Sequence, residues 1–259
     1  MTATTKRILI AGVSGVGRVL AQRLLVRGTA VHLVARSSDK LSALRAELSQ
    51  ISPSAASLIS TSTADAMNDS DMERAAKECL ETSNNVPLTG FVYAVGSIPL
   101  KPLKSTTSKD FADAYQLNVI GGAILLKACL PQLSSGPTAG SAVFFSTVAS
   151  RVGFPNHCAI AAAKGGVEAF VRSAASELAP KVRVNCIAPS LSDTPLASRM
   201  LSNDAVKKAL GEAHPIPRIG TAADSAAMAE FLLDAPWSSF MTGQVISVDG
   251  GRSTLRHKN

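Results

Sequence analysis

The stretch KRILIAGVSGVGRVLAQRLLVRG, residues 6–28, decides the fold. It opens with an apolar run, continues through a glycine-rich turn and ends in a helical pattern of Val, Leu and Ala. Glycines between a strand and a helix let backbone N–H groups and the positive helix end approach a pyrophosphate with no Cβ in the way. The stretch therefore predicts a dinucleotide-binding turn made of Gly12, Ser14, Gly15, Val16 and Gly17.

The same alternation of strand and helix runs along the rest of the chain. Apolar runs predict strands over 6–13, 30–35, 57–61, 88–96, 140–147, 181–189 and 243–251. Helical patterns fill 16–28, 38–50, 69–83, 108–133, 156–179, 193–212 and 221–234. Continuous apolar strands that alternate with helices indicate a parallel sheet covered on both faces. We therefore expect a doubly wound α/β fold of about seven strands, and, because no linker or repeat interrupts it, one domain over residues 1–259.

The composition fits a folded protein with a full core. The chain has 259 residues, of which 46% are hydrophobic and 17% charged. Apolar runs are short, and we expect none to reach the roughly 18 residues of a membrane-spanning helix. The start, MTATTKRILIAGV, shows no signal-peptide or transit-peptide pattern. These features predict a cytoplasmic protein with no membrane partner.

The net charge of +7 raises the question of a nucleic-acid partner. Basic residues are scattered and only 4% of residues are aromatic, which leaves little for base stacking. We expect no nucleic-acid partner, and anionic small molecules fit the charge better. The four cysteines are far apart with no CxxC pair, so we expect neither disulfides nor a metal site.

The second predicted strand indicates which cofactor binds. An NAD site requires a carboxylate about 20 residues past the glycines, whereas this chain has Ala35 and then Arg36. Arg36 could bind the 2′-phosphate of NADP(H), or it could be a solvated arginine at the start of a helix. Asp65, after the third strand, could accept a hydrogen bond from the adenine amino group or act as the N-cap of the next helix.

Six further motifs resemble those of the short-chain dehydrogenase/reductase family. They cover essentially the whole chain: VYAVG (92–96), LNVIGG (117–122), FFSTVASRVGF (144–154), AAAKGGVEAF (161–170), RVNCIAPSLSDTP (183–195) and TGQVISVDGG (242–251). The resemblance implies a Rossmann-like fold, a nicotinamide cofactor and an oxidoreductase activity.

The resemblance also implies an active site of Asn, Ser, Tyr and Lys. Asn118 matches the asparagine, Lys164 matches the lysine, and Thr147 stands in the serine position and keeps a hydroxyl. The tyrosine position, four residues before Lys164, holds Ile160. Isoleucine cannot donate a proton, so the general acid of ordinary carbonyl reduction is missing, a group worth about 10²–10⁴ in rate.

Other implied features lie around this site. Ala94 and Gly96 belong to the motif beside the cofactor, although Tyr93 and Ala94 replace its two asparagines. The glycine turn is one residue shorter than usual, and Ser190 replaces the glycine after Pro189. Residues of about 190–215 are expected to form a substrate lid. The family also implies that Thr194 reaches the nicotinamide carboxamide, and that a homodimer or homotetramer forms through helix 156–179.

His157 is a candidate replacement for the missing acid. It lies seven residues before Lys164, where the enoyl-thioester reductase branch of the family places its tyrosine. A histidine can give or take a proton near neutral pH. The alternative is that His157 only opens the long helix and is solvated or bonded to the backbone. Cys158 has no evident base partner and is expected to be a packed thiol.

Three functions remain open at this point. The first is an NADP-dependent oxidoreductase that acts on a small-molecule carbonyl or activated C=C substrate with a non-tyrosine proton donor. The second is an NADP-binding protein with little redox turnover, acting as a regulator or oligomer partner. The third is a non-redox catalyst in the same pocket. Retention of Asn118, Thr147 and Lys164 together favours the first, and Ile160 favours the second.

Overall fold

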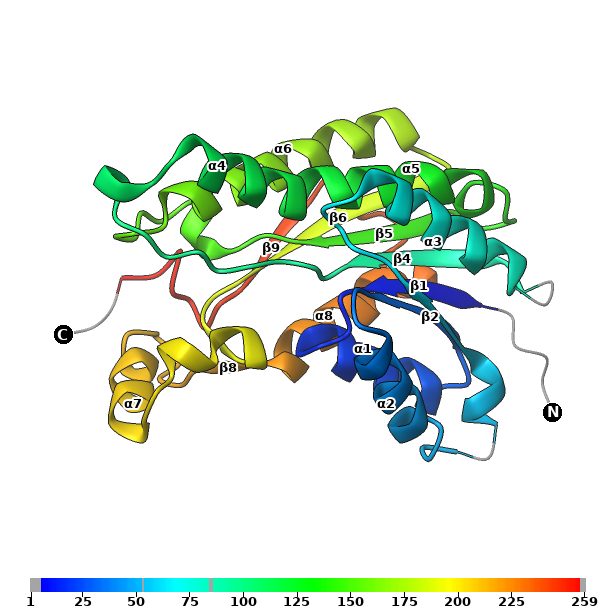
Figure 1. Ribbon diagram of the computed structural model, residues 1–259, viewed down its shortest axis with the longest axis horizontal. Helices are drawn as coiled ribbons and strands as arrows, with labels where there is room; N and C mark the ends of the chain where they lie inside the picture. The colour runs from blue at the N-terminus through cyan, green and yellow to red at the C-terminus, as the bar shows by residue number, and fades with distance from the viewer. Residues whose placement is uncertain (1–5, 53, 84–85, 257–259) are drawn as a thin grey trace.

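A computed structural model describes residues 6–52, 54–83 and 86–256. Its centre is a seven-stranded parallel sheet in the order β3-β2-β1-β4-β5-β6-β9 (Figure 1). The strands are β1 (Arg7–Ala11), β2 (Ala30–Ala35), β3 (Ile59–Thr63), β4 (Leu88–Tyr93), β5 (Gly140–Phe145), β6 (Val182–Pro189) and β9 (Val245–Val248). The doubly wound α/β prediction is confirmed, and each predicted strand forms. Residues 1–5, the first part of the stretch MTATTKRILIAGV, and residues 257–259 lie outside the described part.

Two helical layers enclose the sheet (Figure 1). One face carries α3 (Asp69–Glu81), α4 (Ser108–Tyr115), α5 (Gly121–Leu133) and α6 (Cys158–Leu178). The other carries α1 (Val16–Val26), α2 (Ser38–Leu48) and α8 (Ala222–Leu233), with the short α9 (Ala235–Ser238) after it. Because both faces are covered, the strands are apolar on both sides and two core clusters form, one under each layer.

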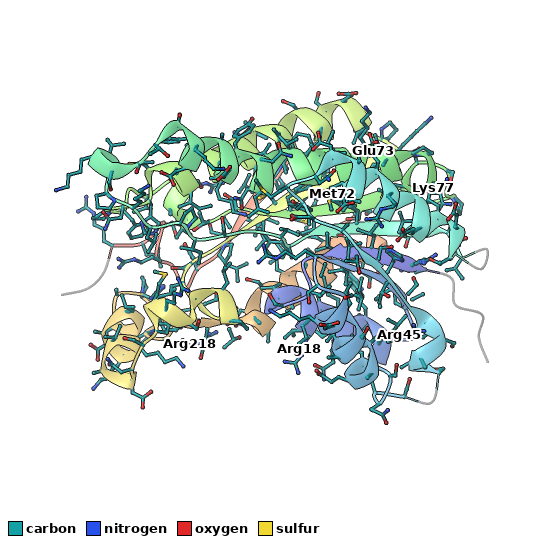
Figure 2. All side chains as sticks on the ribbon, in the orientation of Figure 1. Arg18, Arg45, Met72, Glu73, Lys77 and Arg218 are labelled. Atoms are coloured by element: carbon teal, nitrogen blue, oxygen red, sulfur yellow. The ribbon has the colours of Figure 1, made fainter. Side chains whose placement is uncertain are left out.

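Helix α3 shows how local sequence sets these layers. Asn68 caps its N-terminus by accepting hydrogen bonds from the backbone N–H groups of Ser70 and Asp71. Within the helix, Met72 is buried toward the sheet, whereas Glu73 and Lys77 point to solvent (Figure 2). The spacing of apolar and charged residues therefore places one face of the helix on the core.

The prediction of one helix over 193–212 is wrong. The segment forms β7 (Ser192–Asp193), a 3-10 helix over Pro195–Met200 and α7 (Asp204–Glu212), and β7 pairs with β8 (Gly220–Thr221). Leu201 leaves the helical region with φ −110° and ψ 49°, and Asn203 caps α7 by accepting from Val206 N–H. The two helical pieces are therefore separate, and they lie beside one end of the sheet (Figure 1).

A continuous helical run spans Ser108–Leu133 because a π-helical turn, Gln116–Ile120, joins α4 to α5. By length and composition alone this run could cross a membrane, so the expectation that no stretch reaches that length is wrong. Leu125, Leu126 and Cys129 of the same run are buried in the core cluster against the sheet. A core helix of this kind satisfies the same length criterion.

Candidate functional site

A cavity of about 870 Å³ runs along the carboxyl ends of the strands. Loops after β1, β2, β3, β4, β5 and β6 all contribute to its wall, as does the turn after β9. Ligands of open α/β sheets bind at this edge, where the chain crosses from one layer to the other. Predicted residues that line it are Gly12, Ser14, Gly15, Val16, Arg36, Asp65, Ala94, Gly96, Thr147, His157, Lys164, Pro189 and Thr194.

The glycine turn after β1 leaves no room for side chains. Gly12 has φ +89°, and a Cβ there would lie 2.6 Å from the carbonyl carbon of Ala94. A Cβ on Gly17 would lie 1.9 Å from the carbonyl oxygen of Gly12, so Gly17 supports the turn from behind the cavity. Gly15 caps α1, whose free N–H groups face the space that a pyrophosphate would occupy. The turn fits a dinucleotide phosphate although it is one residue short.

Three polar side chains border the cavity where β2 meets α2. Arg36 is exposed, Ser37 caps α2 by accepting from Lys40 N–H, and Lys40 itself lines the cavity. The predicted Arg36 therefore has two partners that the sequence analysis missed. Two cations and a helix N-terminus form a suitable site for a phosphate. Spacing on the first turn of α2 could have indicated Lys40, four residues after Arg36.

Asp65 lines the cavity at the same end, and the alternative of an N-cap is wrong. Its Oδ1 accepts from Met67 N–H at 3.0 Å, while Asn68 caps α3. The turn 65–68 is closed by a hydrogen bond from Asn68 N–H to the Asp65 carbonyl, 2.9 Å. Asp65 therefore keeps a carboxylate oxygen available at the cavity wall.

The loop after β5 is held rigidly against α6. The buried carboxylate of Glu168 accepts from the hydroxyls of Ser146 at 2.9 Å and Ser150 at 2.7 Å, and pairs with Arg151 at 3.3 Å. Thr147 lies between the two serines and lines the cavity with its hydroxyl, which also accepts from Ala149 N–H. Anchoring on both sides fixes the hydroxyl that stands in the family's serine position.

Lys164 and Asn118 meet behind Gly96. A Cβ on Gly96 would lie 3.2 Å from Asn118 Oδ1 and 3.4 Å from Lys164 Nζ. Asn118 is 1% exposed, and its Nδ2 donates to the Ala114 carbonyl at 2.8 Å. Its Oδ1 has no hydrogen-bond partner in the described structure, which fits a bound water or ligand group there. The buried Tyr93 hydroxyl donates to the Leu117 carbonyl and so anchors the π-helical turn that contains Asn118.

Burial lowers the pKa of Lys164 from its ordinary 10.5 to about 8. The ammonium lies at the cavity wall and donates to the Phe145 carbonyl at 2.7 Å. One hydrogen bond leaves two N–H donors for a ligand. A desolvated lysine with free donors is a candidate for ribose binding and proton transfer.

Ile160 is 3% exposed and lines the cavity on the α6 helix, one turn before Lys164. The tyrosine position therefore faces the pocket and presents only methyl and methylene groups. His157 is the N-cap residue of α6, is half-buried, and also lines the cavity. Its Nδ1 lies 2.7 Å from the Pro155 carbonyl, so Nδ1–H donates there and Nε2 is left for a ligand. Cys158, beside it, is exposed rather than packed.

Three side chains at the same end were missed by sequence reasoning. Ser190 Oγ lies 2.8 Å from His214 Nε2, and both residues line the cavity. His214 is buried, and its Nδ1 faces the Leu210 carbonyl at 3.0 Å. Arg252, after β9, also lines the cavity. These residues come together only through tertiary contacts, so no local spacing could have linked them.

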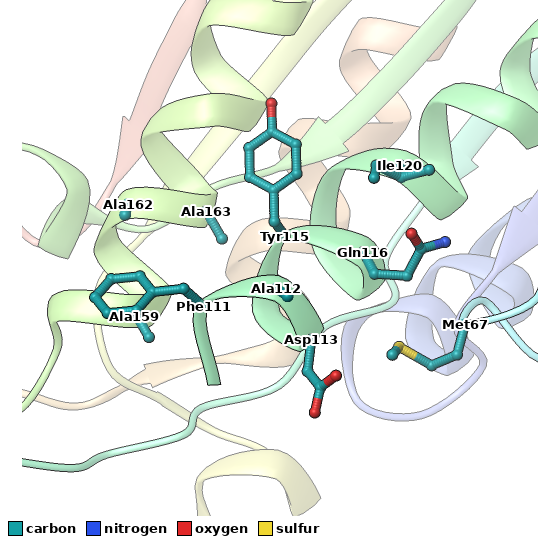
Figure 3. Close-up of a pocket in the computed structure, with 10 residues that line it drawn as sticks. All are labelled: Met67, Phe111, Ala112, Asp113, Tyr115, Gln116, Ile120, Ala159, Ala162 and Ala163. Atoms are coloured by element: carbon teal, nitrogen blue, oxygen red, sulfur yellow. The ribbon is translucent and has the colours of Figure 1, made fainter. Parts of the chain in front are cut away.

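A second hollow of about 630 Å³ lies on the outer side of the helices, away from the nucleotide turn. Figure 3 shows the rings of Phe111 and Tyr115, on α4, beside the small side chains of Ala159, Ala162 and Ala163, on α6. Phe111 is 37% and Tyr115 46% exposed. The lining is mostly apolar, and its polar members are Asp113 and Gln116 (Figure 3).

Comparison with protein families gives one match over most of the chain. The family profile described as enoyl-(acyl carrier protein) reductase matches residues 10–253. A relative from Mycobacterium tuberculosis, an uncharacterized oxidoreductase, is 29% identical over 244 residues, which are 94% of this chain and 90% of the relative.

Solved structures give the same result. A short-chain type dehydrogenase/reductase from Mycobacterium ulcerans is 31% identical, with a TM-score of 0.89, and the match covers 100% of this chain and 94% of that one. Levodione reductase is 29% identical, with a TM-score of 0.86 and coverage of 98% and 99%. The fold of the whole chain therefore agrees with that of proteins of one kind.

Proposed function

Because the chain belongs to the short-chain dehydrogenase/reductase family, and is an oxidoreductase of that type, we propose that it uses NADP(H) and transfers hydride to or from a carbonyl or activated C=C substrate. The observation that supports the cofactor is the glycine turn at the start of α1, which lines the cavity beside the Arg36, Ser37 and Lys40 cluster. Backbone contacts at Gly12 and Gly17 leave no space for a Cβ and hold the turn in place. Position 35 holds alanine and not an acidic residue, so no carboxylate at that position would repel the 2′-phosphate of NADP(H).

Side chains of the cavity would bind the cofactor and stabilise the reacting substrate. When bound, the nicotinamide supplies or accepts the hydride. Lys164 would donate to the nicotinamide ribose with the N–H groups that Phe145 leaves free. Thr147 would donate its hydroxyl to the substrate oxygen and so stabilise negative charge that develops there. Thr194, whose Cβ lies 3.2 Å from where a Cβ on Gly15 would be, would reach the nicotinamide carboxamide from beside the glycine turn.

Proton transfer requires a group other than residue 160. His157 Nε2 is the candidate, because the ring borders the cavity and Nδ1–H is committed to the Pro155 carbonyl. Nε2 of the neutral ring would accept the proton when the substrate is oxidised, and the imidazolium would donate it from Nε2–H when the substrate is reduced. An imidazole one turn back from the tyrosine position suits a conjugated substrate, in which charge develops on an enolate oxygen farther from the hydride acceptor. The alternative that His157 only bonds the backbone is partly supported by the same hydrogen bond.

The test has a binding step and a turnover step. Calorimetric titration with NADP⁺, NADPH, NAD⁺ and NADH is expected to show tighter binding of the phosphorylated pair. A hydride-transfer screen of ketones, enones and enoyl thioesters follows, and enones or enoyl thioesters are expected to react. Equal or tighter binding of NADH contradicts the cofactor proposal. Binding without turnover of any class favours an NADP-binding protein, the function that Ile160 supports.

We also propose that a second copy of the chain packs on the hollow of Figure 3 to form a homodimer, or a homotetramer built from it. Small residues on α6 allow close helix approach, and a Cβ on Gly165 would meet no atom within 4 Å, so this face is open. Light scattering on Ala162→Arg is expected to show a smaller assembly. The control is Ala46→Arg, which adds the same charge to exposed α2. An unchanged mass for Ala162→Arg contradicts the proposal.

A further inference from the structure

Arg252 lies at the opposite end of the cavity from Arg36. Arg36 and Asp65 follow β2 and β3, at one side of the sheet, whereas Thr147, Ser190 and Arg252 follow β5, β6 and β9, at the other. Thr147 is the hydroxyl assigned to the reacting substrate oxygen. Arg252 therefore belongs to the substrate end of the pocket, not to the nucleotide end.

The turn that carries Arg252 is built by its own hydrogen bonds. Asp249 accepts from Gly251 N–H and Ser253 N–H, each at 2.9 Å. The turn packs on the segment after α7, because Ile216 N–H donates to the Gly250 carbonyl at 2.9 Å. These contacts fix the backbone around Arg252 and occupy the Asp249 carboxylate with the turn itself, and Arg252 lines the cavity.

The guanidinium is held in position without being neutralised. Its Nη1 donates to the Ala213 carbonyl, and its centre lies 5.8 Å from the centroid of the Phe154 ring. No carboxylate of the described residues lies within ion-pair distance of it. An arginine has five N–H donors in a planar fork, so most of them face no described acceptor.

The surroundings favour an anion at this end. Among the described residues, Asp65 is the one carboxylate that lines the cavity, at the adenine end, whereas His157 and His214 line it together with Arg252. The segment between β7 and α8 adds the apolar side chains of Leu196, Met200 and Leu210 to the same lining. A ligand that fits this lining has an apolar body and one negatively charged group.

We propose that the substrate is a carbonyl or conjugated compound with a carboxylate, and that Arg252 binds this carboxylate. The inference rests on the proposed function for the identity of the pocket, and it adds the substrate class. A planar carboxylate matches the guanidinium fork and can accept two of its free N–H groups. The charged group would then orient the substrate. Its apolar body would lie along Leu196, Met200 and Leu210, and its reacting atom would point toward Thr147.

The experiment compares acids with their neutral amides of the same shape. Three pairs are titrated into the NADP⁺-saturated protein: 4-acetylbenzoate and 4-acetylbenzamide, levulinate and levulinamide, cinnamate and cinnamamide. At least one acid is expected to bind about tenfold or more tightly than its amide. Arg252→Met is expected to abolish that preference, and Arg252→Lys to keep part of it, because lysine keeps the charge without the fork.

Controls separate this inference from loss of folding and from general charge. Arg256→Met removes the same charge from an exposed position four residues on and should keep the preference. If Arg252→Met does not fold, Arg252→Gln keeps an N–H donor for the Ala213 carbonyl and should also lose the preference. The inference is overturned if no acid binds better than its amide, or if the folded Arg252→Met or Arg252→Gln protein keeps the preference. It is equally overturned if Arg256→Met loses the preference.

Failure of the proposed function has a different signature. NADP⁺ affinity is measured first on the protein alone, and absence of binding contradicts the proposed function. The acid and amide titrations are then repeated without nucleotide, where an Arg252-dependent preference still supports the anion site. Normal NADP⁺ binding with no preference for any acid overturns the anion site and leaves the proposed function standing.

Discussion

The two ends of the long cavity differ in how they are made. The nucleotide end rests on backbone: Gly12 and Gly17 leave less space than a methyl group needs, and α1 begins at the turn. The substrate end rests on side chains: Thr147, Ile160 and Arg252 each reach the cavity from a different segment. A backbone site tolerates few substitutions, whereas a side-chain site can lose a group and keep its shape. This explains how a chain can retain the cofactor motif and carry isoleucine in place of tyrosine.

The largest expected effect concerns that isoleucine. Ile160→Tyr places a hydroxyl one turn before Lys164 on the same helix face, and is expected to raise reduction of a simple ketone by about 10²–10⁴-fold. Steady-state rates with NADPH measure it. Ile160→Phe is the matched control, since it adds the ring without the proton. A folded, NADPH-binding Ile160→Tyr protein that reduces no ketone would show that the substrate end has changed at more than one residue.

The nucleotide end is tested by Gly17→Ala. The new Cβ would meet the Gly12 carbonyl oxygen at 1.9 Å, so the turn must move by more than 1 Å. A displacement of that size is expected to weaken NADPH binding by about 10²-fold and to lower the melting temperature. Gly153→Ala is the control, because its Cβ would meet no atom within 4 Å. Normal affinity in Gly17→Ala would mean that the turn is not held by backbone contact.

The choice between NADP(H) and NAD(H) is tested at Arg36, where the nucleotide end depends on a side chain. Arg36→Ala is expected to weaken NADPH binding by about 1.5–3 kcal/mol, the range for hydrogen bonds to charged groups, and to leave NADH binding unchanged. Calorimetry with both nucleotides measures the difference. Arg45→Ala removes an exposed arginine from α2, the helix that follows Arg36, and should change neither affinity. Equal loss of affinity for NADPH and NADH would show that Arg36 does not bind the 2′-phosphate and is a solvated arginine.

Lys164 links the two ends, and its burial gives a pH-dependent effect. Because the pKa falls from 10.5 to about 8 on folding, the buried charge destabilises the native state below pH 8. Lys164→Met removes this cost but also the bond to Phe145, so the apo protein is expected to gain about 2 kcal/mol at pH 7.

The sign of the pH dependence follows from the two pKa values. Between pH 8 and 10.5 the native wild type loses the proton while the unfolded chain keeps it, so the wild type becomes relatively more stable and the advantage of Lys164→Met shrinks. Denaturant unfolding at several pH values measures it, with exposed Lys127→Met as control. A pH-independent difference would contradict a buried, titrating lysine. Turnover of Lys164→Met should be lost at every pH.

The smallest expected effect is at His157. His157→Phe keeps a ring beside Phe154, whose centroid lies 5.5 Å away, and removes Nε2 from the cavity wall. Turnover of an enoyl thioester is expected to fall about tenfold, less than the 10²–10⁴-fold of a fully enclosed general acid, because the ring is half-buried and water can supply part of the proton transfer. NADPH affinity should be unchanged, since the imidazole would act on substrate rather than cofactor. Full turnover in this variant would assign the proton to water or Thr147.

The sequence predicted the nucleotide end better than the substrate end, for a physical reason. Strand, glycine turn and helix are contiguous, so Gly12 and Arg36 could be placed from spacing alone. His214 and Arg252 reach the cavity through contacts between segments that are distant in sequence, and no periodicity encodes such contacts. The helix wrongly predicted over 193–212 had local signals against it, namely Pro195 and the Asn203 cap.

The exposed Cys158 has a practical consequence. The other three cysteines are buried, and burial raises the pKa of Cys79 to about 11 and of Cys186 to about 12, so these thiols react slowly with alkylating reagents. A maleimide dye would therefore attach at a single natural position, next in sequence to His157, which lines the cavity. The unmodified gene product thus carries its own attachment point for a fluorescent reporter of ligand occupancy.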